Sequence, residues 1–271
     1  MRLPLGAVSR RAAALAACAA LAWPARELSA GGVEEIRKAA SILPGMGPPD
    51  IIYPPAFTGR WRVTQTLADV QTPLGPDKAP ADAIDRLKTQ PQVASYDARF
   101  VAVDGGAIAD RAFNAVQREA ALARISAREL SAAWEPSNPN VLTITRGQTI
   151  TEVKVTKRAV EAASAPNTFG SSEYARVADA GSSGPLGAVP LIRATRVQAR
   201  YKWEGGPDGS PPARIDALEI ASLYDPTATG FADLAGASPV IVSKSRLTLE
   251  RDARSAAAES DGPPVGARDD L

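Results

Sequence analysis

Two short polar blocks of the sequence carry side chains that could bind a ligand. Carboxylate, guanidinium, amide and hydroxyl groups of this kind fix the polar end of a small molecule in a protein pocket. The polar residues are Asp110, Arg111 and Asn114 in the block DRAFN, and Ser171, Ser172 and Glu173 in the block FGSSE. The competing interpretation, which we favour, is that Asp110 and Arg111 form a surface ion pair worth about 0–1 kcal/mol and that the serines cap a turn.

Composition excludes most catalytic chemistry. Histidine is absent and Cys18 is the only cysteine. An imidazole base and an intramolecular disulfide are therefore excluded, and one cysteine cannot form the His and Cys ligand set of a zinc or haem site. Because Cys18 lies in the predicted targeting segment, we expect no catalytic thiolate either. The sequence also lacks an EF-hand-like acidic loop and a dense carboxylate cluster. We therefore predict no catalytic residue, no metal and no cofactor. An enzyme that works through Asp, Glu, Tyr, Lys or Ser is the last of our alternatives.

The balance of charge bears on the partners of the protein. The 271 residues include 31 Lys and Arg and 30 Asp and Glu, for a net charge of +1. Such a chain has no general attraction for nucleic acid. Tyr201 and Trp203 share one face of a predicted strand with Val197 and Ala199, and no basic stripe accompanies them. We predict that these two aromatic side chains line the core or a ligand cavity, and that the protein binds no nucleic acid.

Residues 1–30 have the composition of a cleavable targeting segment. An arginine-rich start is followed by the apolar run AAALAACAALAW and by small residues up to Ala30, as in a signal peptide. The run is too short to span a bilayer comfortably, so the mature protein is not expected to be integral to a membrane. Arg10 and Arg11 resemble a twin-arginine signal. LAAC, ending at Cys18, also fits a lipoprotein cleavage box, and a buried Ala-rich helix is a further alternative.

The remaining chain divides into an arm, a domain and a tail. Residues 31–56 are predicted to lead into a domain at 57–251, and residues 252–271 lack apolar anchors and are predicted to be disordered. Within the domain, alternation of apolar and polar residues predicts antiparallel strands. Turns at Asp104-Gly105-Gly106 and Gly147-Gln148 predict hairpins. The strand segments are 57–67, 94–103, 107–116, 140–146, 149–158, 172–179, 195–203, 214–224 and 240–251.

Two segments break the alternation. Residues 80–90 have Ile84 and Leu87 at helical spacing and are predicted to form a short helix over one mouth of a barrel. Residues 117–134 combine helix-forming composition with strand character, so the sequence leaves their structure open.

A Gly-x-Trp triplet begins the first predicted strand. Gly59 and Trp61 resemble the signature of the lipocalin and calycin families, in which the tryptophan closes one end of the barrel and a late-strand arginine packs across the indole. Arg246 or Arg251, on the last predicted strand, would supply that arginine through a cation–π contact. Taken without the resemblance, Trp61 is equally explained as an ordinary core residue.

A wider set of blocks is similar to one uncharacterised family of plastid and cyanobacterial proteins, a domain of unknown function. The resemblance covers most of residues 45–252. It implies a mainly β fold: a single antiparallel lipocalin-like β-barrel of about eight to nine strands with one or two short helices. It also implies targeting to the chloroplast thylakoid lumen; the bacterial periplasm is the alternative. The blocks are PDIIYPPAFTGRWRVTQTLADVQTPLG, DRAFN, NPNVLTITR, TEVKVTKRAVE, FGSSEYARV and SKSRLTLER.

Three function classes follow from these observations. A barrel of about eight strands holds one small ligand, so we expect a binding protein for a small hydrophobic molecule such as a lipid, a pigment or a quinone. The alternative is a non-catalytic accessory protein that docks on a photosynthetic membrane complex of the thylakoid. A barrel enzyme acting on a hydrophobic substrate comes last. The residues expected at the ligand are Trp61, Asp110, Arg111, Asn114, Ser172, Glu173, Tyr201 and Trp203.

Overall fold

The structure is a computed structural model that describes residues 47–161, 163, 165–180, 191–205, 210–225 and 237–252. The predicted targeting segment, the first part of the arm and all but the first residue of the predicted tail lie outside the described residues.

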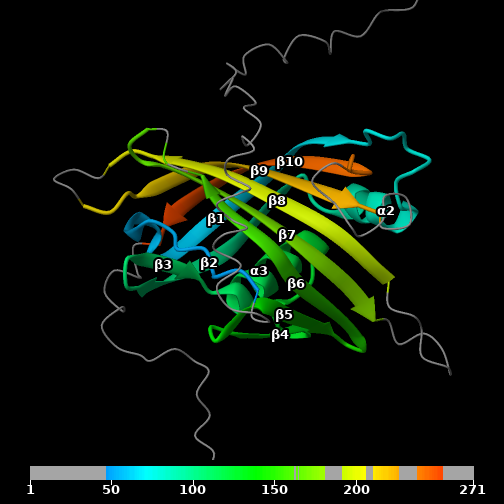
Figure 1. The fold of residues 1–271 in the computed structure, drawn as a ribbon, viewed down its shortest axis with the longest axis horizontal. Helices are drawn as coiled ribbons and strands as arrows, with labels where there is room; N and C mark the ends of the chain where they lie inside the picture. The colour runs from blue at the N-terminus through cyan, green and yellow to red at the C-terminus, as the bar shows by residue number, and fades with distance from the viewer. Residues whose placement is uncertain are drawn as a thin grey trace, which may run out of the picture.

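The described chain forms one strongly curled antiparallel sheet with two α-helices (Figure 1). Spatial order follows the chain from β4 to β10, continues through β1 and β2, and ends at β3. The strands are β1 (Gly59–Gln71), β2 (Val93–Val103), β3 (Gly106–Ala109), β4 (Leu130–Glu135), β5 (Asn138–Arg146), β6 (Thr149–Glu161), β7 (Thr168–Ala180), β8 (Leu191–Trp203), β9 (Arg214–Tyr224) and β10 (Ile241–Arg251). The helices are α2 (Ala81–Thr89) and α3 (Arg111–Ala123), with 3-10 turns η1 (Pro55–Phe57) and η2 (Ala127–Glu129).

The prediction of a mainly β, antiparallel, barrel-like fold is confirmed, but the strand count is wrong. The described residues form ten strands, where about eight to nine were expected. The additional strand is β4, which lies in the segment whose structure the sequence left open. Its alternation covers only six residues after a helix, so it is too short to stand out as a periodic pattern.

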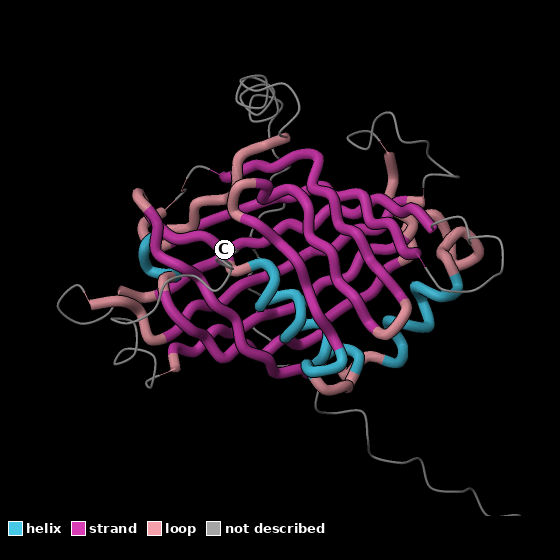
Figure 2. Tube along the Cα trace, turned by 90° about the horizontal axis from the view of Figure 1, so that it is seen from below, coloured by secondary structure: helices cyan, strands magenta, loops and turns pink. Residues whose placement is uncertain are grey.

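The sheet is a half-barrel whose two ends, β3 and β4, are not paired with each other within the described chain. Helix α3 connects these two strands in the sequence and packs against β2, β4 and β5. Figure 2 shows α3 lying across the sheet, with α2 toward one end. The opening is therefore spanned by a helix where a closed barrel would have a hydrogen-bonded ladder.

Helix α3 replaces the second half of the strand predicted over 107–116. Asp110 is the N-cap of the helix, and its Oδ1 accepts a hydrogen bond from the backbone N–H of Phe113 at 3.0 Å. This contact satisfies one of the amide groups that the first turn of a helix leaves free. Helix-forming residues follow as far as Ala123, so the cap decides where the strand ends.

The core is densest at the end of the half-barrel where β1 begins. Aromatic rings from Tyr53, η1, β2, β7 and β8 pack there with centroid separations of 5.0–6.2 Å. Several of the pairs are edge to face, a favourable geometry for π systems. The aromatic residues of this cluster are Tyr53, Phe57, Phe100, Phe169, Tyr201 and Trp203. They fill the interior at this end.

Trp61 lies fully buried beside the aromatic cluster, with no accessible surface. Its indole N–H donates to the carbonyl of Phe57 at 2.6 Å. The guanidinium of Arg251 lies 4.3 Å from the ring centroid and donates to the carbonyls of Thr58 and Ala56. Arg246, the other arginine considered from the sequence, is exposed on β10.

The described part of the predicted arm belongs to the core. Ile51 and Tyr53 are buried, and Tyr53 exchanges backbone hydrogen bonds with Ala107 on β3 at 2.7 and 2.9 Å. Gly106 lies so close to the carbonyl of Tyr53 that a Cβ there would collide with it. Residues 47–53 therefore form a strap along the edge of β3.

We expect Trp61→Ala to lower the free energy of unfolding by about 3–5 kcal/mol, because it leaves a large cavity and removes the partner of Arg251. Urea unfolding followed by circular dichroism measures this change. Arg246→Ala is the matched control and should change stability by less than about 0.5 kcal/mol. A loss below about 1 kcal/mol for Trp61→Ala would contradict a buried, packed indole.

Candidate ligand-binding site

The DRAFN block fastens the start of α3 to the neighbouring strand β2. Asp110 forms an ion pair with Arg99, and the Asn114 side chain bonds both the N–H and the C=O of Arg99, at 2.7 and 3.0 Å. Phe113 lies under the Arg99 guanidinium, 5.0 Å from the ring centroid. Asp110 and Asn114 thus have partners within the protein, and their role in the structure is to place α3.

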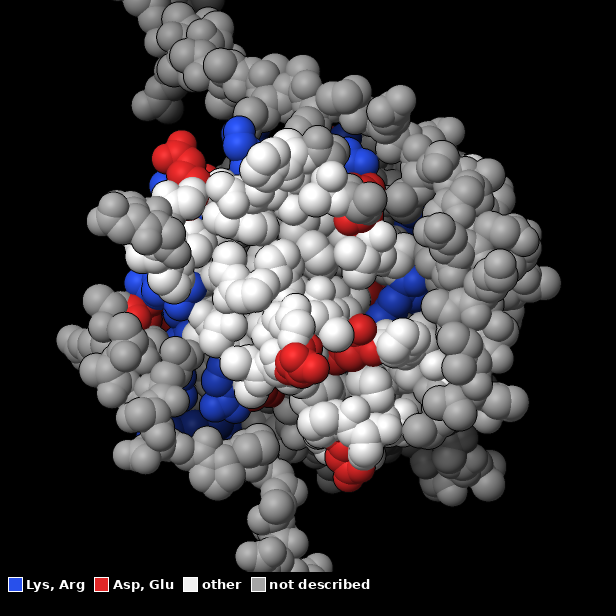
Figure 3. Space-filling view, turned by 60° about the vertical axis from the view of Figure 1, so that its left-hand side comes forward, with Lys and Arg blue, Asp and Glu red and all other residues white. Residues whose placement is uncertain are grey.

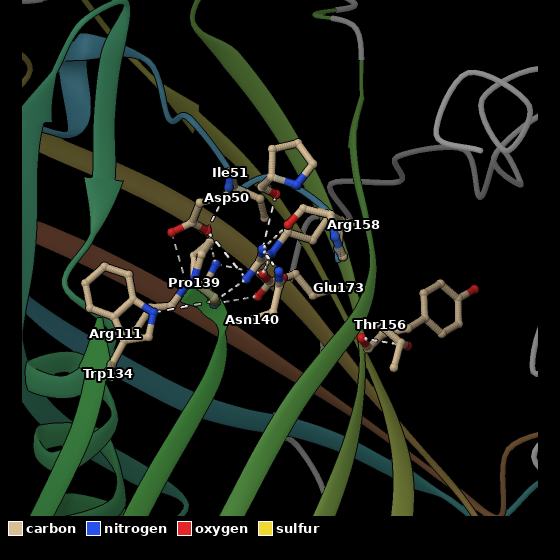
Figure 4. A network of polar contacts seen from close by, with 12 residues as sticks. Asp50, Ile51, Arg111, Trp134, Pro139, Asn140, Thr156, Arg158 and Glu173 are labelled. Atoms are coloured by element: carbon tan, nitrogen blue, oxygen red, sulfur yellow. Dashed lines mark hydrogen bonds and ion pairs between the residues drawn. The ribbon is translucent and has the colours of Figure 1, made fainter. Parts of the chain in front are cut away.

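Arg111 is the member of the block that points inward, into a buried charge network (Figure 4). It binds Asp50 of the strap at 2.5 Å and Glu173 of β7 at 2.7 Å. Glu173 also accepts a hydrogen bond from Arg158 of β6 at 2.6 Å. Two acids and two arginines therefore join the strap, the helix and two strands.

Arg158 binds the strap as well as the charge network. Its guanidinium donates to the carbonyls of Pro48 and Pro49, both at 3.1 Å, and to the side chain of Asn140 at 2.6 Å. A further bond reaches the carbonyl of Pro139 at 2.7 Å. Buried guanidinium groups require this degree of pairing because unpaired charge is costly to desolvate.

The electrostatics of the network keep Arg111 and Glu173 charged. Burial opposes the charged form of Arg111 and of Glu173, but each is outweighed by the opposite charges nearby. Glu173 and Asp50 raise the pKa of Arg111 above its ordinary value. Arg111 and Arg158 lower the pKa of Glu173 below its ordinary value. The pairing therefore stabilises the ionised network.

A second ion pair crosses the interior of the half-barrel. Arg118, two turns along α3 from Arg111, forms a two-pronged pair with Glu219 on β9. Nearby, the Tyr96 hydroxyl donates to the Gln65 side chain at 3.1 Å, and Gln65 donates to Ser245 at 3.2 Å. Burial is the main reason that the pKa of Tyr96 rises to about 12.

The inner face of the sheet becomes less buried with distance from the aromatic cluster. Side chains of alternate residues share one face of a strand. The strand register therefore defines the set of residues that lie on the inner face together with Glu173 and Glu219. Many of its apolar members, beyond the aromatic end, are only half-buried. These are Leu67, Leu142, Ile144, Val153, Val177, Val197, Ala221, Leu223 and Leu247. The Arg118 side chain also keeps 34% of its surface accessible.

Apart from Asp110 and Asn114, which contact Arg99 at the start of α3, the residues predicted at a ligand fall into three places. Trp61, Tyr201 and Trp203 belong to the aromatic end, whereas Arg111 and Glu173 meet directly in the charge network.

Ser172 occupies the third place, on the outer face of β7, because neighbouring residues of a strand point to opposite sides. There it accepts a hydrogen bond from Arg196 at 3.2 Å. Ser171, its neighbour, shares the inner face with Glu173.

Sequence reasoning missed five residues of the charge network and of the second ion pair, namely Asp50, Arg118, Asn140, Arg158 and Glu219. A usable signal exists for Glu219, which alternates with Ile215 and Ala217 on the apolar face of its strand. Arg158 gives no such signal, because a bulge between Val155 and Lys157 shifts the alternation and turns Arg158 inward.

Two further properties concern the described ranges alone. No group of three or more His, Cys, Asp or Glu side chains is arranged there to hold a metal ion. In the same ranges, no helix has both the length and the hydropathy needed to cross a membrane.

We expect Glu173→Gln to lower the free energy of unfolding by about 3 kcal/mol at pH 7, because it breaks a buried ion pair. This is the lower end of the range for such pairs, since Glu173 keeps 23% of its side-chain surface accessible. The wild-type network contributes fully above the ordinary glutamate pKa of 4.5 and loses this contribution as pH falls through the lower folded value.

Urea unfolding between pH 7 and pH 3 measures both effects. Glu173→Gln should show a weaker fall of stability with acid than the wild type, whereas the exposed control Glu250→Gln should follow the wild type. Parallel curves for the wild type and Glu173→Gln would refute a stabilising charge on Glu173.

Comparison with known proteins addresses the identity of the fold. Searches of curated proteins and of solved structures gave no match. A family model, described as a domain of unknown function (DUF6816), matches residues 45–253. The match begins just before the strap and ends just after β10, so it contains both charge networks and the whole curled sheet. The chain therefore belongs to the DUF6816 family.

Proposed function

We propose that the protein is a non-catalytic binding module that holds one small, mainly apolar molecule between the inner face of the half-barrel and α3. The observation that carries this proposal is the set of half-buried apolar side chains on that face. Concave, mostly apolar surfaces with a few placed polar groups are typical of small-molecule sites. A lipid, a pigment or a quinone has the required chemistry.

The placement of polar groups supports a binding site better than a catalytic one. Arg118 and Glu219 bind each other, and Arg111 and Glu173 belong to a paired network. A general acid or base needs a proton to exchange near neutral pH, and the low pKa of Glu173 disfavours that use. These charges hold α3 in position over the site.

We also propose a lipocalin-like relationship and export to the thylakoid lumen, with the bacterial periplasm or a lipid anchor at Cys18 as alternatives. Gly59, Trp61 and Arg251 support the lipocalin-like assignment, because the arginine lies over the indole at the start of β1. The arginine pair and apolar run within residues 1–30 support export. Localisation of a fluorescently tagged full-length chain distinguishes the compartments.

A second candidate function is docking on a membrane complex. Ile52, Val101 and Val103 are exposed apolar residues, and both Ile52 and Val103 lie next to Gly106 of β3. Figure 3 turns this end of the molecule forward and shows uncharged side chains over much of its centre. Exposed apolar patches of this kind occur at protein interfaces. Pro48 and Pro49 of the strap are less suited to docking, because Arg158 already binds their carbonyls.

The binding proposal predicts that filling the inner face blocks an apolar probe. Ala221 lies there between Val197 and Ser243, so Ala221→Trp should weaken binding of the neutral fluorescent probe N-phenyl-1-naphthylamine by roughly tenfold or more. Fluorescence titration measures the affinity.

The matched control is Lys154→Trp, which adds the same ring at an exposed position of β6 and should leave the affinity unchanged. Equal affinity for the wild type and Ala221→Trp would overturn an inner-face site. If Ala221→Trp weakens binding as expected, mass spectrometry of the molecules retained by protein purified from its native membranes would identify the natural ligand.

A further inference from the structure

Two tyrosine hydroxyls in the interior lack the partners that buried polar groups normally have. Among the described residues, no hydrogen bond reaches the phenol oxygen of Tyr53 or of Tyr201. Tyr53 is 8% exposed. Ser171, at 9% exposed, is a third hydroxyl without a partner. Tyr201 is half-buried. Buried hydroxyls are almost always hydrogen-bonded to protein, to water or to a ligand, so this group of three requires an explanation.

The three hydroxyls lie at the boundary between the aromatic cluster and the half-buried apolar face. The rings of Tyr53 and Tyr201 are 6.2 Å apart, edge to face. Tyr201 pairs with Phe169 across the strands, and Ser171 is the next inward residue of β7 after Phe169. The hydroxyls are therefore placed where the polar end of a molecule on the apolar face would reach the aromatic end.

The surrounding charges define which polar end fits. Tyr53 lies within electrostatic reach of all four members of the first network, and Tyr201 lies within reach of Arg118 and Glu219. The charges of each group cancel, so the site is neutral overall. A ligand carrying a full charge would add an unbalanced charge beside satisfied ion pairs.

The hydroxyls themselves act as donors. Burial raises the pKa of Tyr53 and of Tyr201 well above the ordinary tyrosine value, so both phenols stay protonated. A protonated phenol can donate one hydrogen bond to an acceptor oxygen.

From this arrangement we infer that Tyr53 and Tyr201, with Ser171, form a head-group subsite that binds the carbonyl oxygen of a neutral ligand with an apolar body. The inference rests on the proposed function, because the body of the ligand occupies the inner face described above. It narrows the ligand class to ketones, quinones and esters, and it disfavours free carboxylic acids, amines and plain hydrocarbons.

Three naphthalene probes separate the carbonyl from the apolar body. They are 2-acetylnaphthalene, which carries a ketone, 2-ethylnaphthalene, which lacks it, and 2-naphthoate, which is an anion at pH 7. Fluorescence titration of the purified full chain measures each affinity. We expect 2-acetylnaphthalene to bind about tenfold tighter than either of the other two, the gain typical of one or two hydrogen bonds.

Hydroxyl deletions test the residues directly. Tyr53→Phe and Tyr201→Phe keep the rings and should reduce the affinity for 2-acetylnaphthalene to that for 2-ethylnaphthalene, which itself should not change. The control is Tyr174→Phe, whose ring lies under Arg196 away from the inner face. Circular dichroism confirms that each variant is folded; if one is not, the other variant and Ser171→Ala carry the comparison.

The outcomes separate the subsite from the proposed function. If all three probes bind with similar affinity, the hydroxyls serve only ordered water and the subsite is refuted, while the apolar site stands. Tighter binding of 2-naphthoate would also refute a neutral carbonyl subsite. If no probe binds the wild type, the proposed function fails and the subsite fails with it.

Discussion

The four-charge network of Asp50, Arg111, Glu173 and Arg158 is the constraint on which the shape of this protein depends. These residues come from the strap, α3, β6 and β7, and only the two strands are neighbours in the sequence. Removing any one member leaves a net charge in a largely buried network, which is costly. The network therefore holds the strap and α3 against the sheet in a single arrangement. The width of the interior follows from where α3 is held.

Aromatic packing and ion pairs organise different parts of the interior. Aromatic packing around Phe57 and Tyr201 fills one end of the half-barrel and excludes water there. Ion pairs from α3, at Arg111 and Arg118, hold the helix across the opening. Apolar side chains near Ala221 remain half-buried. The packed aromatic end and the half-buried apolar middle are the two features on which the proposed binding function rests.

Much of the fold could be predicted from the sequence because period-two alternation is a local signal. The same signal places Glu219 on an apolar face beside Ala217, so half of one ion pair was accessible from the sequence. The Asp110 cap followed by helix-forming residues was a second usable signal, and the strand prediction over 107–116 overlooked it.

The rest of the site depends on information that is not local. The strand bulge that turns Arg158 inward has no signature in the residues around it. Arg111 and Asp50 are 61 positions apart and meet only because the strap pairs with β3. The polar residues of DRAFN and FGSSE were therefore visible from the sequence, but the pairing of Arg111 with Glu173 was not. The favoured surface pair of Asp110 with Arg111 is wrong, because Asp110 binds Arg99.

The opening between β3 and β4 is spanned by helix α3, and this differs mechanically from closure by hydrogen bonds between two strands. Helix α3 satisfies its own backbone hydrogen bonds, so its grip on β2, β4 and β5 relies on side chains. A small change in the width of the half-barrel would therefore move flexible arginine side chains of α3, and the backbone hydrogen bonds between strands would stay intact. Under the proposed function, ligands of different size would be fitted by lengthening or shortening a few side chains along this contact between α3 and the sheet.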